Sequence, residues 1–183
     1  MPVVYERRKR IFGSIQMMRT ASSVGLISDT HGLLRPEALA ALEGSDLIIH
    51  AGDIGAPEII DRLRLLAPVV AVRGNIDNAS WASRFELTEV IETGSARIFV
   101  LHDIAQLDFD PTTARFDVVV SGHSHKPSHT ERNGVVYVNP GSAGPRRFRL
   151  PVTVARMEFR FKPWTVDFID LLGGSNPIRK GGD

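Results

Sequence analysis

Cysteine is absent from the 183 residues, which excludes a disulfide framework, thiolate zinc sites, iron–sulfur clusters and a cysteine nucleophile. Any metal ion must therefore be held by histidine, carboxylate, amide or water ligands. Long apolar runs are absent as well. Runs such as residues 47–49 and 118–120 have the length of strands, whereas a membrane-spanning helix needs about 20 apolar residues. Since no apolar signal segment is present either, we expect a cytoplasmic protein without a membrane partner.

An excess of charge of one sign is also missing, because 22 Lys and Arg residues face 21 Asp and Glu residues. A formal charge of +1 gives no general attraction to nucleic acid or to anionic membranes. The charge is unevenly divided, however, since residues 1–23 contain five basic residues and one acidic residue. We expect this stretch to be a flexible basic extension. The alternatives are a transit-like segment and a basic arm that binds nucleic acid.

The rest of the chain shows no internal repeat and no linker, so we expect one domain over residues 24–172 and a mobile, Gly-containing tail over residues 173–183. In the first half, short apolar runs alternate with amphipathic segments, which predicts an α/β domain with parallel strand pairing. The predicted strands there are at residues 24–27, 46–50 and 68–72, and the predicted helices at residues 36–43 and 57–66. The second half predicts further strands at residues 84–91, 96–101, 117–120, 130–132, 135–138, 152–161 and 164–171.

Polar side chains follow five of these predicted strands, just past the point where each apolar run ends. Ligands of open α/β sheets bind at the carboxyl ends of the strands, so the five clusters can converge on one rim. The residues concerned are Asp29, His31, Asp53, Asn75, His102, His123 and His125. His50 precedes the second cluster but lies within the strand pattern, and we interpret it as a buried residue that supports the site.

Two Asp, one Asn and four His form a ligand set that suits Mn, Fe, Zn, Ni or Co better than Ca, which prefers all-oxygen cages. Seven such residues suffice for two metal sites that share one carboxylate. Each residue taken alone also has a plain structural explanation: Asp53 can cap the following helix, and Asn75 can be a turn residue beside Gly74. Because all the clusters follow predicted strands one after another along the chain, the metal site is favoured over separate structural explanations.

At the level of motifs the sequence resembles the calcineurin-like metallophosphoesterases, and most closely their small single-domain bacterial and archaeal phosphodiesterases. The resemblance spans residues 24–172. It rests on Asp29-Thr30-His31-Gly32, Gly52-Asp53, Gly74-Asn75-Ile76-Asp77, His102, Gly122-His123-Ser124-His125 and Asn139-Pro140-Gly141-Ser142. We expect the last of these motifs to support the His123–His125 loop rather than to react.

The resemblance implies a four-layer α/β/β/α sandwich with two mixed β-sheets. It also implies two divalent metal ions, with Mn²⁺ favoured and Fe, Ni or Zn as alternatives, and hydrolysis of phosphodiesters by a hydroxide that bridges the metals. Asn75 and Asp53 then have catalytic roles, and Asn75 also contacts the substrate. One metal would be held by Asp29, His31 and His125, the other by Asn75, His102 and His123, with Asp53 bridging the two.

The sequence departs from the family pattern at two places. Many members have a proton-donating His where Ile76 stands, so we expect a preference for aryl and other good leaving groups. Asp77 is a candidate acid in its place, with a supporting or turn role as the alternative. Asp103 replaces a Gly after His102, which either disfavours dianionic monoesters or only reshapes the loop.

The expected partner is a phosphodiester small molecule or nucleotide. Arg146, followed by Arg147, is the candidate for the substrate phosphate, and a solvated surface charge is the alternative. We expect no stable nucleic-acid partner, and a homodimer is plausible. A different class of function is also open, because the family includes a retromer subunit that acts chiefly by binding partners: a non-catalytic scaffold with the same fold.

Overall fold

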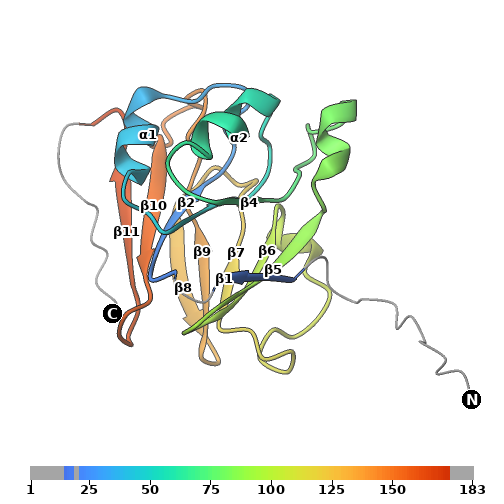
Figure 1. Cartoon of the computed structure of the whole chain (residues 1–183), viewed down its shortest axis with the longest axis vertical. Helices are drawn as coiled ribbons and strands as arrows, with labels where there is room; N and C mark the ends of the chain where they lie inside the picture. The colour runs from blue at the N-terminus through green and yellow to red at the C-terminus, as the bar shows by residue number, and fades with distance from the viewer. Residues whose placement is uncertain (1–14, 19–20, 174–183) are drawn as a thin grey trace, which may run out of the picture.

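Two mixed β-sheets organise the residues that the computed structural model describes, which are 15–18 and 21–173 (Figure 1). The predicted tail beyond residue 173, and most of the predicted extension, lie outside this range. The six-stranded sheet has the order β1 (Ile15–Met18), β5 (Thr88–Thr93), β6 (Arg97–Leu101), β7 (Val118–Val120), β9 (Val135–Asn139) and β8 (Ser128–Arg132). The five-stranded sheet has the order β11 (Thr165–Asp170), β10 (Thr153–Glu158), β2 (Ser23–Ile27), β3 (Leu47–His50) and β4 (Val69–Ala71).

The main core lies between the two sheets, because alternate residues of each strand face inward. In β3, Leu47 and Ile49 join this core, whereas Ile48 points to the opposite face of the sheet. In β7, Val118 and Val120 meet the core from the other side. The resulting interior is apolar, and its burial determines which face of each sheet points inward.

Helices α1 (Pro36–Leu42) and α2 (Pro57–Leu63) cover the outer face of the five-stranded sheet (Figure 1). Each begins with a proline in its first turn, where the missing N–H costs no hydrogen bond. Ile59, Ile60 and Leu63 lie on the buried side of α2 and pack with Ile48. Each predicted helix is therefore present, with α2 three residues shorter than expected.

The outer face of the six-stranded sheet is covered by the 3₁₀-helix η2 (Ile104–Gln106) and the turns that follow it. Phe99 on this face packs edge-to-face against Phe109, with ring centroids 5.0 Å apart, and at a tilt against Phe116, at 5.2 Å. The predicted four-layer arrangement with two mixed sheets is confirmed, and its fourth layer here is built from η2 and residues 107–116 rather than from an α-helix.

Two elements differ from the sequence-based expectation. Strand β1 pairs in parallel with β5, although it lies in the range assigned to a flexible extension. The strand predicted at residues 84–91 starts later, because Ser80–Arg84 forms the 3₁₀-helix η1 and β5 begins at Thr88. Long-range pairing determines β1, and local turn geometry determines where β5 begins. Neither cause produces an apolar periodicity in the sequence.

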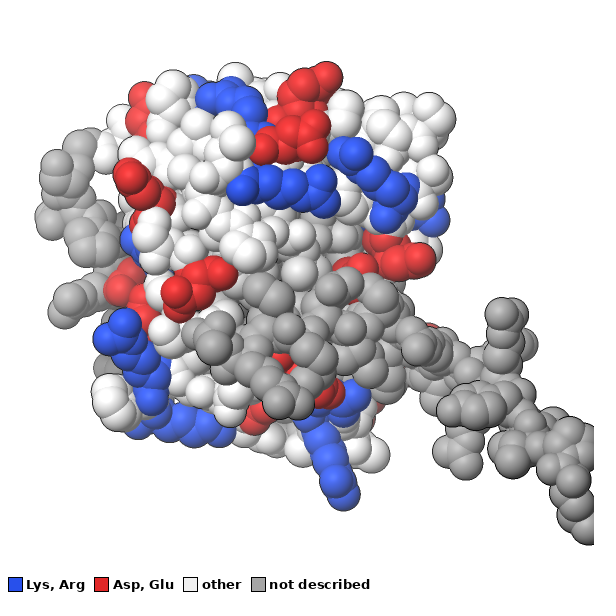
Figure 2. All heavy atoms as spheres, viewed as in Figure 1, with Lys and Arg blue, Asp and Glu red and all other residues white. Residues whose placement is uncertain are grey.

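Charges of both signs are interspersed over the face drawn in Figure 2, so no single-sign patch covers that face. Within the described residues, no helix is long and apolar enough to cross a membrane.

Candidate metal centre

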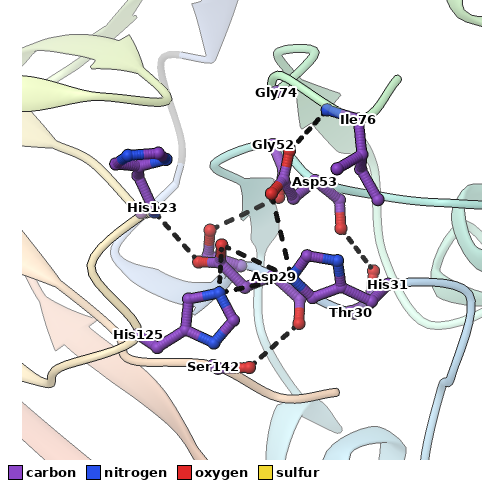
Figure 3. Close-up of polar contacts among 12 residues, drawn as sticks. Asp29, Thr30, His31, Gly52, Asp53, Gly74, Ile76, His123, His125 and Ser142 are labelled. Atoms are coloured by element: carbon purple, nitrogen blue, oxygen red, sulfur yellow. Dashed lines mark hydrogen bonds and ion pairs between the residues drawn. The ribbon is translucent and has the colours of Figure 1, made fainter. Parts of the chain in front are cut away.

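The seven candidate ligands come together where loops from both sheets meet. The parallel strands β2, β3 and β4 deliver one set of loops, and the parallel pair β6 and β7 delivers the other. Figure 3 shows His31, His125 and Asp53 turned toward Asp29 at the middle of this cluster. The predicted convergence of five strand ends is thus present in the structure.

Five of the seven residues have a left-handed backbone, which is unusual outside glycine. Their φ values are 54° for Asp29, 47° for His31, 54° for Asp53, 66° for His123 and 58° for His125. Such a conformation costs about 1–3 kcal/mol per residue and persists only where the surroundings impose it. Strain of this kind gathers at functional sites, and here it turns each side chain into the same space.

Asp29, His31 and His125 form the first group of ligand atoms. The Nε2 atoms of His31 and His125 lie 3.2 Å apart, and Asp29 Oδ1 is 3.3 Å from His125 Nε2. Asp29 Oδ2 accepts a hydrogen bond from the His123 N–H (3.1 Å), whereas the buried Oδ1 has no hydrogen-bond partner. A buried carboxylate oxygen without a partner is costly, and a cation would satisfy it.

Asp53 lies between this group and the second one. Its Oδ2 is 3.8 Å from His31 Nε2, and its Oδ1 is 3.3 Å from His102 Nε2. Oδ1 also accepts the Ile76 N–H at 3.1 Å, and Gly74 packs so closely that a Cβ there would collide with the Asp53 carboxylate. The glycine is therefore required by the approach of backbone to carboxylate.

Asn75, His102 and His123 form the second group. Asn75 Oδ1 is 3.1 Å from both His102 Nε2 and His123 Nδ1. His102 Nδ1 donates to the Ala51 carbonyl (2.8 Å), which leaves Nε2 to face the oxygens of Asp53 and Asn75. The polar atoms of Asn75, His102 and His123 thus lie close together, as the ligands of a cation do.

The charge states reflect the same crowding. Burial acts to lower the pKa of His102, but hydrogen bonds with Asp53 and the Ala51 carbonyl outweigh it and leave the pKa raised. Burial acts to raise the pKa of Asp53, yet hydrogen bonds from His102 and Ile76 leave it lowered. For His31, burial is the largest influence and leaves the pKa lowered despite the attraction of Asp53. The carboxylate of Asp53 thus favours positive charge at His102.

The described residues contain two groups of His and carboxylate atoms that lie within 4.8 Å of one another: Asp29, His31 and His125, and Asp29, Asp53 and His102. The first equals one predicted ligand set. The second contains Asp29 as well as Asp53, so both carboxylates lie near the boundary between the two groups. The oxygen and imidazole donors of both groups fit a divalent cation.

His50 is a buried residue next to the centre, as predicted. It is fully buried, and its Nε2 lies 2.9 Å from the Thr30 hydroxyl, which itself donates to the Ile54 carbonyl (2.8 Å). The ring therefore carries its proton on Nε2, and Nδ1 accepts the Gly52 N–H (3.3 Å). Burial lowers the pKa of His50 to about 4. Thr30 was not singled out from the sequence, although its place inside the Asp29-Thr30-His31 motif marks it.

The Asn139 side chain holds the loop that carries His123 and His125. Its amide donates to the Gly122 carbonyl (2.6 Å) and to Ser124 Oγ (3.1 Å) and accepts the Gly141 N–H (2.9 Å). This is the supporting role that the sequence suggested for the segment.

The contacts of Asp77 match the supporting role that the sequence left open beside the catalytic one. Its carboxylate is only 2% exposed and accepts three backbone N–H groups, from Ile54 (3.1 Å), Gly55 (2.9 Å) and Gly74 (2.8 Å). These three N–H groups hold both carboxylate oxygens against the backbone. Asp77 fixes the loops of Asp53 and Asn75 relative to each other.

Of the two adjacent arginines, Arg147 is the one that contacts a candidate ligand. Arg147 Nη2 lies 3.4 Å from His31 Nε2, whereas no described hydrogen bond or ion pair joins the exposed Arg146 to the site. The sequence carries no signal that distinguishes two neighbouring arginines in this way.

The two departures from the family pattern lie at the edge of the centre. Ile76 is 41% exposed beside Asp53, with no group that can donate a proton from its side chain. Asp103 Oδ2 is 3.9 Å from His123 Nε2, and both residues line a pocket of about 110 Å³ with His102 and Asn75.

Residues 23–162 match the calcineurin-like phosphoesterase superfamily domain, so the chain belongs to that superfamily. A probable metallophosphoesterase from Methanothermobacter thermautotrophicus is 36% identical over 148 residues, covering 74% of this chain and 86% of the relative. A phosphodiesterase from Methanocaldococcus jannaschii is 27% identical over 137 residues, covering 64% of this chain and 82% of that protein. Among solved structures, Vps29 of Entamoeba histolytica in complex with Zn²⁺ superimposes with a TM-score of 0.68 at 25% identity, covering 84% of this chain and 94% of that one.

Proposed function

We propose that the chain is a metal-dependent phosphodiesterase that binds two divalent cations at the candidate metal centre. The observation that carries the proposal is the clustering of Asp29, His31, Asp53, His102 and His125, with Asn75 and His123 beside His102. The buried Asp29 Oδ1 in this cluster has no hydrogen-bond partner. Membership of the phosphoesterase superfamily supports the same conclusion.

In this proposal Asp29, His31 and His125 hold one cation, Asn75, His102 and His123 hold the other, and Asp53 contacts both. Two such cations would neutralise phosphoryl oxygens and acidify a water molecule. The mixed oxygen and imidazole donors favour Mn²⁺, with Fe, Ni or Zn as alternatives. Zn²⁺ is the ion bound by the Vps29 relative.

The surrounding side chains position a phosphodiester. The exposed Asn75 offers an amide nitrogen, and Arg147 offers a guanidinium next to His31, so both can donate to phosphate oxygens. Asp103 places a carboxylate beside His123, on the opposite part of the centre. A monoester dianion is repelled by this carboxylate more strongly than a diester monoanion, which favours diesters.

Hydrolysis of bis(4-nitrophenyl) phosphate by purified protein tests the proposal. We expect turnover with added Mn²⁺ and none with excess chelator. The variant D53N should lower turnover at least a hundredfold and reduce the metal content below two ions per chain by elemental analysis. The exposed helix residue Asp61, paired with Arg64 at 3.6 Å, supplies the control D61N, which should behave as wild type. Two bound metals in D53N would contradict the bridging role.

The diester preference has its own test in the variant D103N. Removing the negative charge should raise kcat/KM for 4-nitrophenyl phosphate about five- to tenfold relative to bis(4-nitrophenyl) phosphate. The ratio of the two values is the measurement, since it cancels any general change in activity. An unchanged ratio means that Asp103 only shapes its loop.

The Vps29 relative favours a second candidate, a scaffold that binds other proteins, because it shares the fold over 84% of this chain. If protein that carries both metals hydrolyses none of a panel of aryl diesters, the scaffold is favoured.

A further inference from the structure

A basic turn with an exposed aromatic tip borders the candidate metal centre. Leu150 donates its N–H to the Arg147 carbonyl (3.1 Å), which closes a turn with Phe148 and Arg149 at its centre. Arg147 contacts His31, and Arg146, Arg147 and Arg149 are all exposed. Three cationic side chains therefore lie on one short segment, and one of them reaches the ligand cluster.

Phe148 is held where an aromatic residue is least expected. Its φ of 52° is left-handed, a conformation that favours Gly, Asn or Asp at the first central position of a turn. Its side chain is 96% exposed, so packing does not account for its presence. An aromatic ring fixed outward between arginines presents a flat apolar face next to cationic groups.

A fourth arginine contacts the chain just before this turn. Arg35, from the segment before α1, donates through Nη2 to the Gly144 carbonyl at 3.4 Å, while its Nε is buried without a hydrogen-bond partner. Gly144 in turn donates its N–H to the Asp29 carbonyl (3.2 Å), so Arg35 and Arg147 both lie toward the Asp29 and His31 part of the centre. The carboxylate of Asp103 lies instead beside His123.

We propose that residues 146–149 bind the nucleotide next to the scissile phosphodiester of a single-stranded oligonucleotide. This inference rests on the proposed function and names its substrate class. Arg147 contacts phosphate near the centre, Phe148 stacks on an unpaired base, and Arg146 and Arg149 contact the phosphates that follow. Arginine and aromatic side chains together form the common platform for single strands, because every base has a stacking face.

A single strand fits better than a membrane surface for a reason of position. The turn touches a centre whose donors suit phosphate chemistry, and each nucleotide supplies both a phosphate for arginine and a ring for Phe148. A duplex hides its base faces, so it can engage only the arginines. We therefore expect the affinity to depend on unpaired bases and to be higher for a strand than for a small diester.

Fluorescence anisotropy with a labelled eight-nucleotide DNA strand, in chelator to prevent cleavage, measures binding apart from turnover. We expect F148A and R149Q each to weaken binding about tenfold, and the matched duplex to bind less tightly than the strand. Phe161 is 83% exposed elsewhere on the molecule, so F161A is the matched control and should bind as wild type. Equal affinity of F148A, F161A and wild type overturns the proposal.

Kinetics with Mn²⁺ separate this proposal from the proposed function. If wild type fails to hydrolyse bis(4-nitrophenyl) phosphate, the proposed function fails, and the anisotropy result still decides strand binding. If it succeeds, the ratio of kcat/KM for a tetranucleotide to that for bis(4-nitrophenyl) phosphate should fall about tenfold in F148A. Phe148-dependent binding to phosphatidylglycerol vesicles without strand binding would overturn the proposal in favour of a membrane surface.

Discussion

At the scale of single residues, Ile76 bears on the leaving group of the proposed reaction. Ile76 has no proton to donate, and Asp77 is held by backbone N–H groups. In that reaction the departing oxygen would leave without a side-chain acid from this loop. We therefore predict a preference for leaving groups of low pKa, such as nitrophenolate.

The variant I76H restores a donor at this position. We expect the rate on alkyl phosphodiesters to rise about 10- to 100-fold, with little change on bis(4-nitrophenyl) phosphate, because only an alkoxide needs protonation. Parallel assays of methyl 4-nitrophenyl phosphate and a dialkyl phosphate report the difference. I76N, which is polar but does not titrate, is the control. An equal gain on both substrates would speak against a proton-donor role.

His50 makes stability depend on pH. Its pKa of about 4 lies below the ordinary value of 6.5. Between pH 4 and pH 6.5, His50 is therefore protonated in the unfolded chain but neutral in the folded chain. Stability then rises with pH in this window and is lost on acidification. The loss due to His50 amounts to about 2–3 kcal/mol between pH 7 and pH 4.5.

Urea unfolding of chelator-treated protein at both pH values measures this loss. H50Q keeps hydrogen-bonding groups but cannot take the proton, so its acid loss should be smaller than that of wild type by about 2 kcal/mol. His129 lies on the exposed strand β8 and supplies the control H129Q, which should lose as much as wild type. Equal losses in H50Q and wild type would mean that His50 is not buried in its neutral form.

At the scale of elements, strand β9 begins after an exposed turn and ends beside the candidate metal centre. Asn133 lies in the exposed turn before the strand, while Asn139 ends the strand and holds the loop of His123 and His125. Groups that orient metal ligands typically change metal affinity 10- to 100-fold when removed.

We expect N139A to weaken Mn²⁺ binding at least tenfold, because the loop loses two hydrogen bonds at its base. Chelator competition monitored by isothermal titration measures the affinity. N133G retains the left-handed turn and is the matched control, with wild-type affinity expected. Far-ultraviolet circular dichroism verifies that both variants are folded. Wild-type affinity in folded N139A would show that the loop keeps its shape without the amide.

At the scale of the whole molecule, the centre joins two sheets. Asp29, His31 and His125 come from the β2 and β7 loops, and Asp53 and His102 bring β3 and β6 to the same place. Cations bound here should hold the sheets together and stabilise only the folded state.

We therefore expect Mn²⁺ at a hundred times its dissociation constant to raise the Tm by about 5–10 °C over protein in chelator. Differential scanning calorimetry gives the shift. D61N should show the full shift, and D53N less than half of it. A wild-type Tm that is indifferent to Mn²⁺ would mean that the ligand atoms do not bind the ion in the folded protein.

The strands, the two helices and the loop positions of all seven candidate ligands could be predicted, because apolar runs and the polar residues after them are local patterns. Strand β1 could not, since its pairing with β5 joins residues more than seventy positions apart. The start of β5 was also misplaced, because η1 depends on turn geometry rather than on periodicity.

The sequence by itself determined which residue types are available: no thiolate, two Asp, one Asn and four His at strand ends, which defines the kind of metal chemistry. Only the tertiary structure decided where each side chain points. It turned Asp77 to the backbone, placed Arg147 rather than Arg146 against His31, and left Phe148 outward. The physical reason is that residue identity fixes chemistry, whereas direction depends on backbone dihedrals and long-range hydrogen bonds that exist only after folding.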